Sequence, residues 1–357
     1  MKACTYSMPE ACSETSSRVE TVQVEVAAMH PLLLLKQALP WEAITETMTR
    51  HWRECGKNVD GGPGLPWDVS LYVPLLVLML KTGEADVISV SRERAPEVKS
   101  AGMNVFTKSR WSILGVYFHE QWRTEVPIFK LEVRQALSHA INREELAQYV
   151  FAGSAVPASV FPMPSRTPGA VPDLKPHEYD PDKAKALLKE AGYPNGFEVT
   201  VYSFPRADVP EMVRFIEAMA GYFSEIGVKA KIIPTEYASY RKKRLGFDLP
   251  GALGALAAPN RPLAAMVSLM RLLVHSEGRF TSVKDPALDK LIVKAEEAAT
   301  DADAEAALQE IYRYMYDNVN HLTVVEMDLP YATSAEIKDW DLGGAVWDQN
   351  FTALIRQ

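Results

Sequence analysis

Cysteine, long apolar runs and an excess of positive charge are all scarce in this chain of 357 residues. The three cysteines are Cys4, Cys12 and Cys55, so no disulfide can form within residues 56–357. The most apolar run, residues 69–80, contains Pro74 and is shorter than the roughly 20 residues that a membrane-spanning helix needs. With 38 basic against 46 acidic residues, the net charge of −8 argues against a broad surface for nucleic-acid phosphates. These absences leave an ordinary folded chain.

The short motifs of several enzyme and metal-site classes are also missing. There is no G-x-S-x-G, no G-x-x-x-x-G-K-[ST], no H-E-x-x-H and no cysteine pair at zinc spacing. His51 and Cys55 lie four residues apart, but two ligands do not complete a structural zinc site. We therefore expect no enzyme activity, no metal site and no cofactor.

The N-terminal 26 residues lack the apolar central segment of a secretory signal peptide. As written, the chain carries no export signal, which predicts a cytoplasmic location if it is expressed in this form.

The length predicts about two domains, and the sequence pattern changes near residue 82. Before that point, apolar spacing predicts helices over residues 32–39, 41–52 and 71–81, with a Gly- and Pro-rich loop at 61–66. After it, strand and helix signals alternate, which indicates a mixed α/β fold.

Helix and strand signals are clearest after residue 179. Asp180 as N-cap, Pro181 in the first turn and Gly192 beyond the end predict one helix, which leads into a strand over residues 197–204. The next helix has an apolar stripe at Val213, Ile216, Ala220, Phe223 and Ile226. Later in the chain, the predicted elements are the strand 228–234, a helix opened by Asp285-Pro286, a helix from about 303 to 318 and the strand 321–327. Earlier in the chain, they are strands at 86–91 and 112–118 and a helix at 132–141. A capping box at Asn142 and Glu145 follows that helix.

Four sequence blocks, in this order, resemble the family-5 extracytoplasmic solute-binding proteins of ABC importers. They are VRQALSHAINREEL (133–146), GSAVPASVFPMP (153–164), YDPDKAKALLKEAGYPNGFEVTV (179–201) and DPALDKLIVKAEEA (285–298). The resemblance implies a periplasmic-binding-protein-like, type II, two-lobed cleft fold whose lobes close around a ligand. It also implies a small-molecule or oligopeptide ligand, ABC importer permease subunits as partners, and a periplasmic or cell-surface location.

The resemblance begins only at about residue 83, so the two-lobed fold is predicted to be incomplete at the front. Residues 25–81 instead resemble the N-terminal helical region of IS5-type transposases, without the acidic catalytic core of those enzymes; a divergent helical cap is the alternative for this segment. The predicted organisation is a helical segment at 1–82, a partial first lobe at 83–131, the second lobe at 132–328 and a return to the first lobe at 329–357.

The family pattern also bears on the ligand. Peptide-binding members carry an aspartate, in a segment W-x-A-D-Y-x-x-P, that pairs with the ligand ammonium group. The corresponding segment here is GALAAPNRP (254–262), which places Ala258 at that position. This weakens the case for peptides and leaves oligosaccharides at comparable odds.

Four residues are candidates for lining the cleft: Tyr117, His119, Asn260 and Trp347. Each has a structural alternative, because Tyr117 and Trp347 suit a core, and Asn260 can cap the turn before Pro262. His119 stands where the family usually has asparagine.

These observations predict a truncated solute-binding component of an ABC import system, either still able to bind a solute or inactive. The alternative is a DNA-associated, transposase-derived fusion protein without a catalytic core. Residues 1–82 carry 7 basic and 9 acidic residues, a charge of −2, which argues against strong contact with DNA phosphates.

Overall fold

The computed structural model of the chain describes residues 2–4, 24–26, 76–90, 92–106, 111–206, 209, 211–328, 330–340 and 354–356. The chain divides into two compact units, Met1–Asp86 and Val87–Gln357. In the first unit, β1 (Lys2–Cys4) pairs antiparallel with β2 (Val24–Val26), and residues 76–81 are helical. The helices predicted over 32–39 and 41–52 lie outside the described residues.

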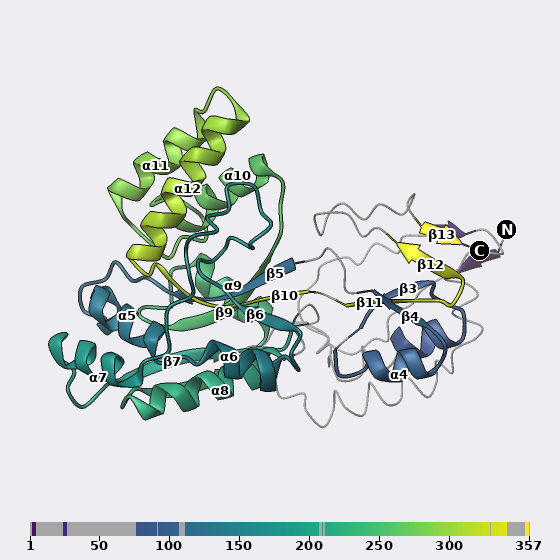
Figure 1. Cartoon of the computed structure of the whole chain (residues 1–357), viewed down its shortest axis with the longest axis horizontal. Coiled ribbons are helices and arrows are strands. Elements are labelled where there is room, and N and C mark those ends of the chain that lie inside the picture. Colours follow the sequence, from purple (N-terminus) through teal and green to yellow (C-terminus); the bar gives the residue numbers. More distant parts are fainter. Residues whose placement is uncertain are drawn as a thin grey trace, which may run out of the picture. The chain divides into compact units, whose positions relative to one another are not determined.

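A mixed six-stranded sheet forms the centre of the second unit (Figure 1). Strand β7 runs parallel to its neighbours β8 and β9, and the other pairings are antiparallel. In spatial order the strands are β6 (Ala155–Pro157), β10 (His321–Asp328), β5 (Trp111–Phe118), β9 (Leu253–Pro259), β7 (Glu198–Ser203) and β8 (Lys229–Pro234).

Both faces of this sheet are covered, and alternate residues of β5 supply the two cores. Leu114, Val116 and Phe118 belong to one hydrophobic core, whereas Ile113 and Tyr117 belong to the other. The first core includes residues of α5 (Leu131–His139), α7 (Pro181–Glu190) and α8 (Met212–Glu225), with the short helix α6 (Arg143–Glu145) nearby. The second includes residues of α9 (Tyr237–Leu245), α10 (Leu263–Val274), α11 (Pro286–Glu296) and α12 (Asp301–Asp317), as Figure 1 shows on the opposite side of the sheet.

A smaller three-stranded sheet is also part of the second unit. Its central strand β11 (Tyr331–Thr333) pairs with β3 (Val87–Ser89) and with β4 (Asn104–Phe106). Helix α4 (Ala95–Ser100) connects the two outer strands, and β12 (Ile337–Trp340) pairs with β13 (Leu354–Arg356). The chain passes between the two sheets twice, from β4 to β5 and from β10 to β11.

Most sequence-based element predictions in the described region are confirmed. The Asp180 side chain accepts a hydrogen bond from the Lys183 backbone N–H at 2.8 Å, and that of Asn142 accepts one from Glu145 at 3.0 Å. The stripe on α8 is partly wrong: Val213 is 38% exposed, and the buried face comprises Met212, Phe215, Ile216, Met219 and Phe223. Residues 237–274, for which no elements were predicted, form α9, β9 and α10.

No helix in the described part of the chain is long and apolar enough to cross a bilayer.

Candidate functional site

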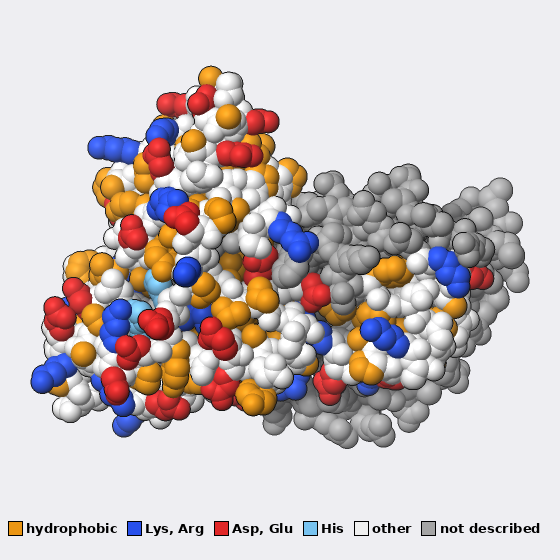
Figure 2. Space-filling model, viewed as in Figure 1, with side chains coloured by type: hydrophobic (Ala, Val, Ile, Leu, Met, Phe, Trp, Pro, Cys, Tyr) orange, Lys and Arg blue, Asp and Glu red, His pale blue; other side chains and the backbone are white. Residues whose placement is uncertain are grey.

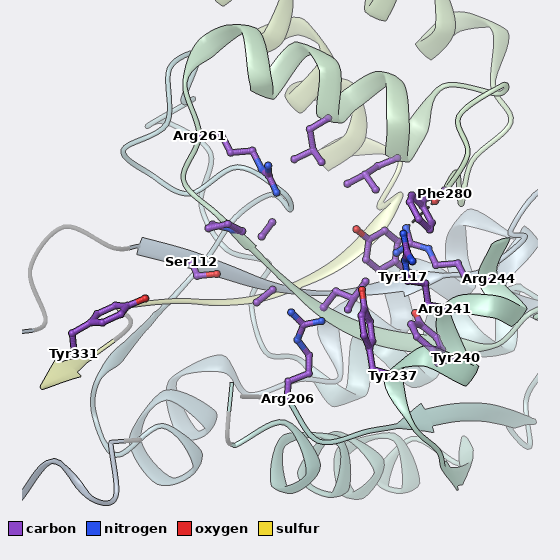
Figure 3. A pocket seen from close by; sticks show the side chains of 16 residues that line it. Ser112, Tyr117, Arg206, Tyr237, Tyr240, Arg241, Arg244, Arg261, Phe280 and Tyr331 are labelled. Carbon is purple, nitrogen blue, oxygen red and sulfur yellow. Dashed lines mark hydrogen bonds between the residues drawn. The ribbon is translucent and has the colours of Figure 1, made fainter. Parts of the chain in front are cut away.

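A cavity of about 420 Å³ lies between the sheet and the helices α9 and α10 (Figure 3). Strands β5 and β9 supply its floor, with Ser112 and Tyr117 from β5 and residues 256–259 from β9. The full set of described lining residues is Ser112, Tyr117, Arg206, Tyr237, Tyr240, Arg241, Arg244, Leu256, Ala257, Ala258, Pro259, Arg261, Leu269, Leu273, Phe280 and Tyr331.

Helix α9 presents one face to this cavity. Tyr237, Tyr240, Arg241 and Arg244 follow the i, i+3, i+4, i+7 spacing that places side chains on one side of a helix. Gly254 on β9 allows this close approach, because a Cβ atom there would overlap the Tyr240 ring and hydroxyl. The packing of Tyr240 against Gly254 therefore positions α9 close to the sheet, and with it Arg241 and Arg244.

Arg244 is the most buried of the lining arginines, at 6% exposure. Its guanidinium lies 4.0 Å from the centre of the Tyr117 ring and donates a hydrogen bond to the Phe280 carbonyl oxygen at 2.8 Å. Its Nε atom is buried without a hydrogen-bond partner. The contact with Tyr117 is a cation–π interaction in a largely desolvated place, where such contacts are strongest.

Two further arginines reach the cavity from loops. Arg206 follows β7 and Arg261 follows β9, and in Figure 3 their guanidinium groups point into the cavity from opposite sides. The Arg206 guanidinium lies 4.8 Å from the centre of the Tyr237 ring, and that of Arg241 lies 5.4 Å from the centre of the Phe280 ring. Four cationic side chains from three segments of the chain thus surround one space.

Beneath the cavity floor, buried aromatic and imidazole rings form a packed cluster. The rings of Tyr117 and His119 are stacked with centroids 5.8 Å apart, and His119 Nε2 shares a hydrogen bond of 2.7 Å with the Tyr240 hydroxyl. His321 Nε2 shares one of 2.8 Å with the Ser282 hydroxyl. Burial, and then the Arg244 guanidinium, lower the pKa of His119 well below its usual range and that of His321 to about 3. Both imidazoles are therefore neutral near pH 7.

The four predicted cleft residues have different positions. Tyr117 lines the cavity, and His119 lies behind it in contact with Tyr240. Asn260 lies next to the lining residues Pro259 and Arg261, and its side-chain oxygen accepts a hydrogen bond from the Thr167 hydroxyl at 2.9 Å. Trp347 lies outside the described residues. Whether any of the four contacts a ligand stays a prediction.

None of the four arginines was predicted from the sequence to line a cleft. The segment YASYRKKRL carries a usable signal, because its tyrosines and two of its basic residues repeat at helical spacing. Arg206 and Arg261 carry no such local signal, since they are brought to the cavity by the order of the strands β7 and β9 in the sheet.

Ala258 lies on the cavity floor with 5% of its surface exposed. None of the described residues that line the cavity is acidic. Among the described residues, no group of three or more His, Cys, Asp or Glu side chains is placed to hold a metal ion.

Comparison with known proteins identifies relatives of this chain. The profile of the family described as bacterial extracellular solute-binding proteins, family 5 Middle, matches residues 75–271. The glutathione-binding protein GsiB of Shigella flexneri is 36% identical over 177 residues, 48% of this chain and 34% of that protein. The dipeptide-binding protein of Escherichia coli is 36% identical over 119 residues, 33% of this chain and 22% of that protein. The chain therefore spans about a third, or less, of these curated relatives' length.

Solved structures share the fold. The periplasmic binding protein DppA from Helicobacter pylori, in complex with the peptide STSA, matches with a TM-score of 0.69 and 19% identity, over 80% of this chain and 55% of that one. NikA from Brucella suis, in complex with Fe(III)-EDTA, matches with a TM-score of 0.66 and 17% identity, over 80% and 60%. The predicted α/β fold of the two-lobed binding proteins is confirmed. These relatives are named as binding proteins, which agrees with the prediction of no enzyme activity. Because the family profile matches more than half of its residues, this chain belongs to family 5 of the bacterial extracellular solute-binding proteins.

Proposed function

We propose that this chain binds a small organic solute in the cavity between β5, β9, α9 and α10, as the solute-binding component of an ABC import system. The observation that carries this proposal is the position of the cavity. Most of its lining residues, including Tyr117 and Arg244, lie within the matched segment 75–271. A cavity of about 420 Å³ falls within the size range typical of small-ligand sites.

Two relatives are named for binding glutathione and dipeptides, which supports a solute of peptide-like size. An oligosaccharide remains the alternative ligand class, as the sequence analysis expected. The importer permease is the expected partner, and the family description supports an extracytoplasmic location.

The truncated front and the transposase-like segment over residues 25–81 stay predictions, because residues 27–75 lie outside the described part of the chain. In Figure 2, acidic and basic side chains are interspersed over the described surface of the face shown, so no broad basic area is visible there. The DNA-associated alternative therefore gains no support from the described residues on that face.

Native mass spectrometry of the purified full chain, followed by calorimetry with glutathione, dialanine and maltotriose, tests the proposal. We expect a co-purified solute or saturable, one-to-one binding of one of these compounds. The variant Leu256→Trp fills the cavity floor and should abolish binding, whereas Leu272→Trp, at a position that is 36% exposed on α10, should not. Absence of any co-purified solute, together with absence of binding of these compounds and of the dipeptide derivatives described below, would overturn the proposal.

A further inference from the structure

We infer that the cavity selects solutes that carry two or more negative charges and does not recognise an ammonium group. This inference rests on the proposed function and names the ligand chemistry of the same site.

The buried Arg244 guanidinium favours an anionic ligand. Its contacts are the Phe280 carbonyl oxygen and the rings of Tyr117 and Phe280, and it forms no salt bridge with any described residue. Its Nε–H remains without an acceptor. A buried cation is costly unless a counter-charge is nearby, and a ligand carboxylate or phosphate in the cavity would supply that charge. The cavity is thus prepared for an anion at this end.

The positions of the other arginines favour a solute with more than one negative charge. Arg206, Arg241 and Arg261 also line the cavity, and Figure 3 shows Arg206 and Arg261 approaching it from sides other than that of Arg244. A solute with a single anionic group cannot lie against all of these guanidiniums at once. A solute with anionic groups at two ends can contact Arg244 at one end and a second arginine at the other.

Recognition of an ammonium group is disfavoured by two features. Ala258 offers only a methyl group on the cavity floor, and no described lining residue is acidic. Three of the aromatic rings that line the cavity already face arginines: Tyr117 faces Arg244, Tyr237 faces Arg206, and Phe280 faces Arg241 and Arg244. An ammonium group would therefore enter a space that is already positive.

Four dipeptide derivatives that share one backbone test this charge preference by calorimetry with the full chain at neutral pH. They are dialanine amide, dialanine, N-acetyl-dialanine and N-succinyl-dialanine, which carry one positive charge, no net charge, one negative charge and two negative charges. We expect affinity to rise in that order, with N-succinyl-dialanine binding about tenfold or more tightly than N-acetyl-dialanine, which is ~1.4 kcal/mol. Added salt should weaken the binding of N-succinyl-dialanine most.

Three variants test which residues cause the charge preference. Arg241 is exposed, so Arg241→Gln should leave the fold intact and weaken N-succinyl-dialanine severalfold. Ala258→Asp should weaken N-succinyl-dialanine and strengthen dialanine, which reverses their order. Arg214→Gln is the control, because this exposed arginine on α8 lies outside the cavity. Thermal melts of each variant report whether it is folded.

Two outcomes overturn the inference. Binding of dialanine or its amide that is as tight as that of N-succinyl-dialanine would show that the site does not select anions, while the proposed solute-binding function would stand. Failure of N-succinyl-dialanine to bind would also overturn it, and the co-purified solute found by mass spectrometry would then decide the proposed function separately.

Discussion

Gly115 on β5 and Gly254 on β9 determine how closely other segments approach the sheet. A Cβ atom at Gly115 would overlap the Phe161 side chain, including its Cβ at 2.8 Å, which cannot move away without a backbone shift. Neither glycine has a positive φ angle, so the close approach of a side chain, and not the backbone conformation, requires glycine there. No local sequence pattern marks either position.

We expect Gly115→Ala to reduce the free energy of unfolding by about 1–3 kcal/mol, because it overpacks a buried position. The matched control is Gly221→Ala on α8, where a Cβ would meet nothing within 4 Å and the higher helix propensity of alanine should stabilise the protein by up to about 1 kcal/mol. Urea denaturation of both variants measures the difference. A stabilising effect at Gly115 would contradict the packing described for Phe161.

The buried His321 imidazole makes stability depend on pH. Its pKa is lowered to about 3 by burial and by Arg244, against about 6.5 in an unfolded chain. Its contribution to stability is complete above about pH 6.5 and is lost as the pH falls from there toward 3, because the unfolded state then binds a proton that the folded state does not.

Between pH 7.5 and 5.5, the wild type should lose about 1.4 kcal/mol more unfolding free energy than His321→Gln, which has no proton to bind at this position. Denaturation curves at the two pH values provide the measurement, and the stability of the variant at pH 7.5 serves as its own reference. Equal losses in both proteins would show that His321 does not titrate differently in the two states.

Local sequence signals determine where helix α7 begins and ends. Its N-cap Asp180, the proline that follows and Gly192 beyond its end all lie where the sequence predicts them. By contrast, β9 was not predicted, because its alanine-rich sequence LGALAAP lacks the β-branched and aromatic residues typical of strands. Pairing with β5 on one side and β7 on the other makes it a strand nonetheless.

Asp180→Ala should lower the free energy of unfolding by about 1 kcal/mol, because the Lys183 backbone N–H loses its acceptor. Asp182→Ala removes a carboxylate from the same first turn without removing the cap, so a smaller loss is expected. Thermal unfolding monitored by circular dichroism compares the two variants. Equal losses would mean that charge near the helix terminus, and not the cap, provides the stabilisation.

At the scale of the whole molecule, a buried ion pair joins distant segments of the second unit. Arg92, which precedes α4, lies 3.2 Å from the Glu211 carboxylate at the start of α8, with side-chain exposures of 6% and 3%. Arg92 also donates a hydrogen bond to the Asp328 carbonyl oxygen at the end of β10. The residues involved are far apart in sequence, so nothing in the local pattern predicts the pair.

Arg92→Met should destabilise the protein by about 3–5 kcal/mol, because it leaves the Glu211 charge buried without its partner. The double variant Arg92→Met/Glu211→Leu should recover a large part of this loss. Arg94→Met, which breaks the exposed pair with Glu97, is the control and should cost less than about 1 kcal/mol. A double variant no more stable than Arg92→Met would contradict the account, as measured by chemical denaturation.

The sequence by itself determined the family, the α/β class, the capped helices α7 and α11, and the absence of an acid at Ala258. These features depend on residues close together in the chain, where caps, turns and apolar periodicity act directly. The tertiary structure alone decided that Arg206, Arg244 and Arg261 line one cavity. Their convergence depends on the strand order β5-β9-β7 and on the close seating of Tyr240 against Gly254, which are long-range contacts that no local pattern specifies.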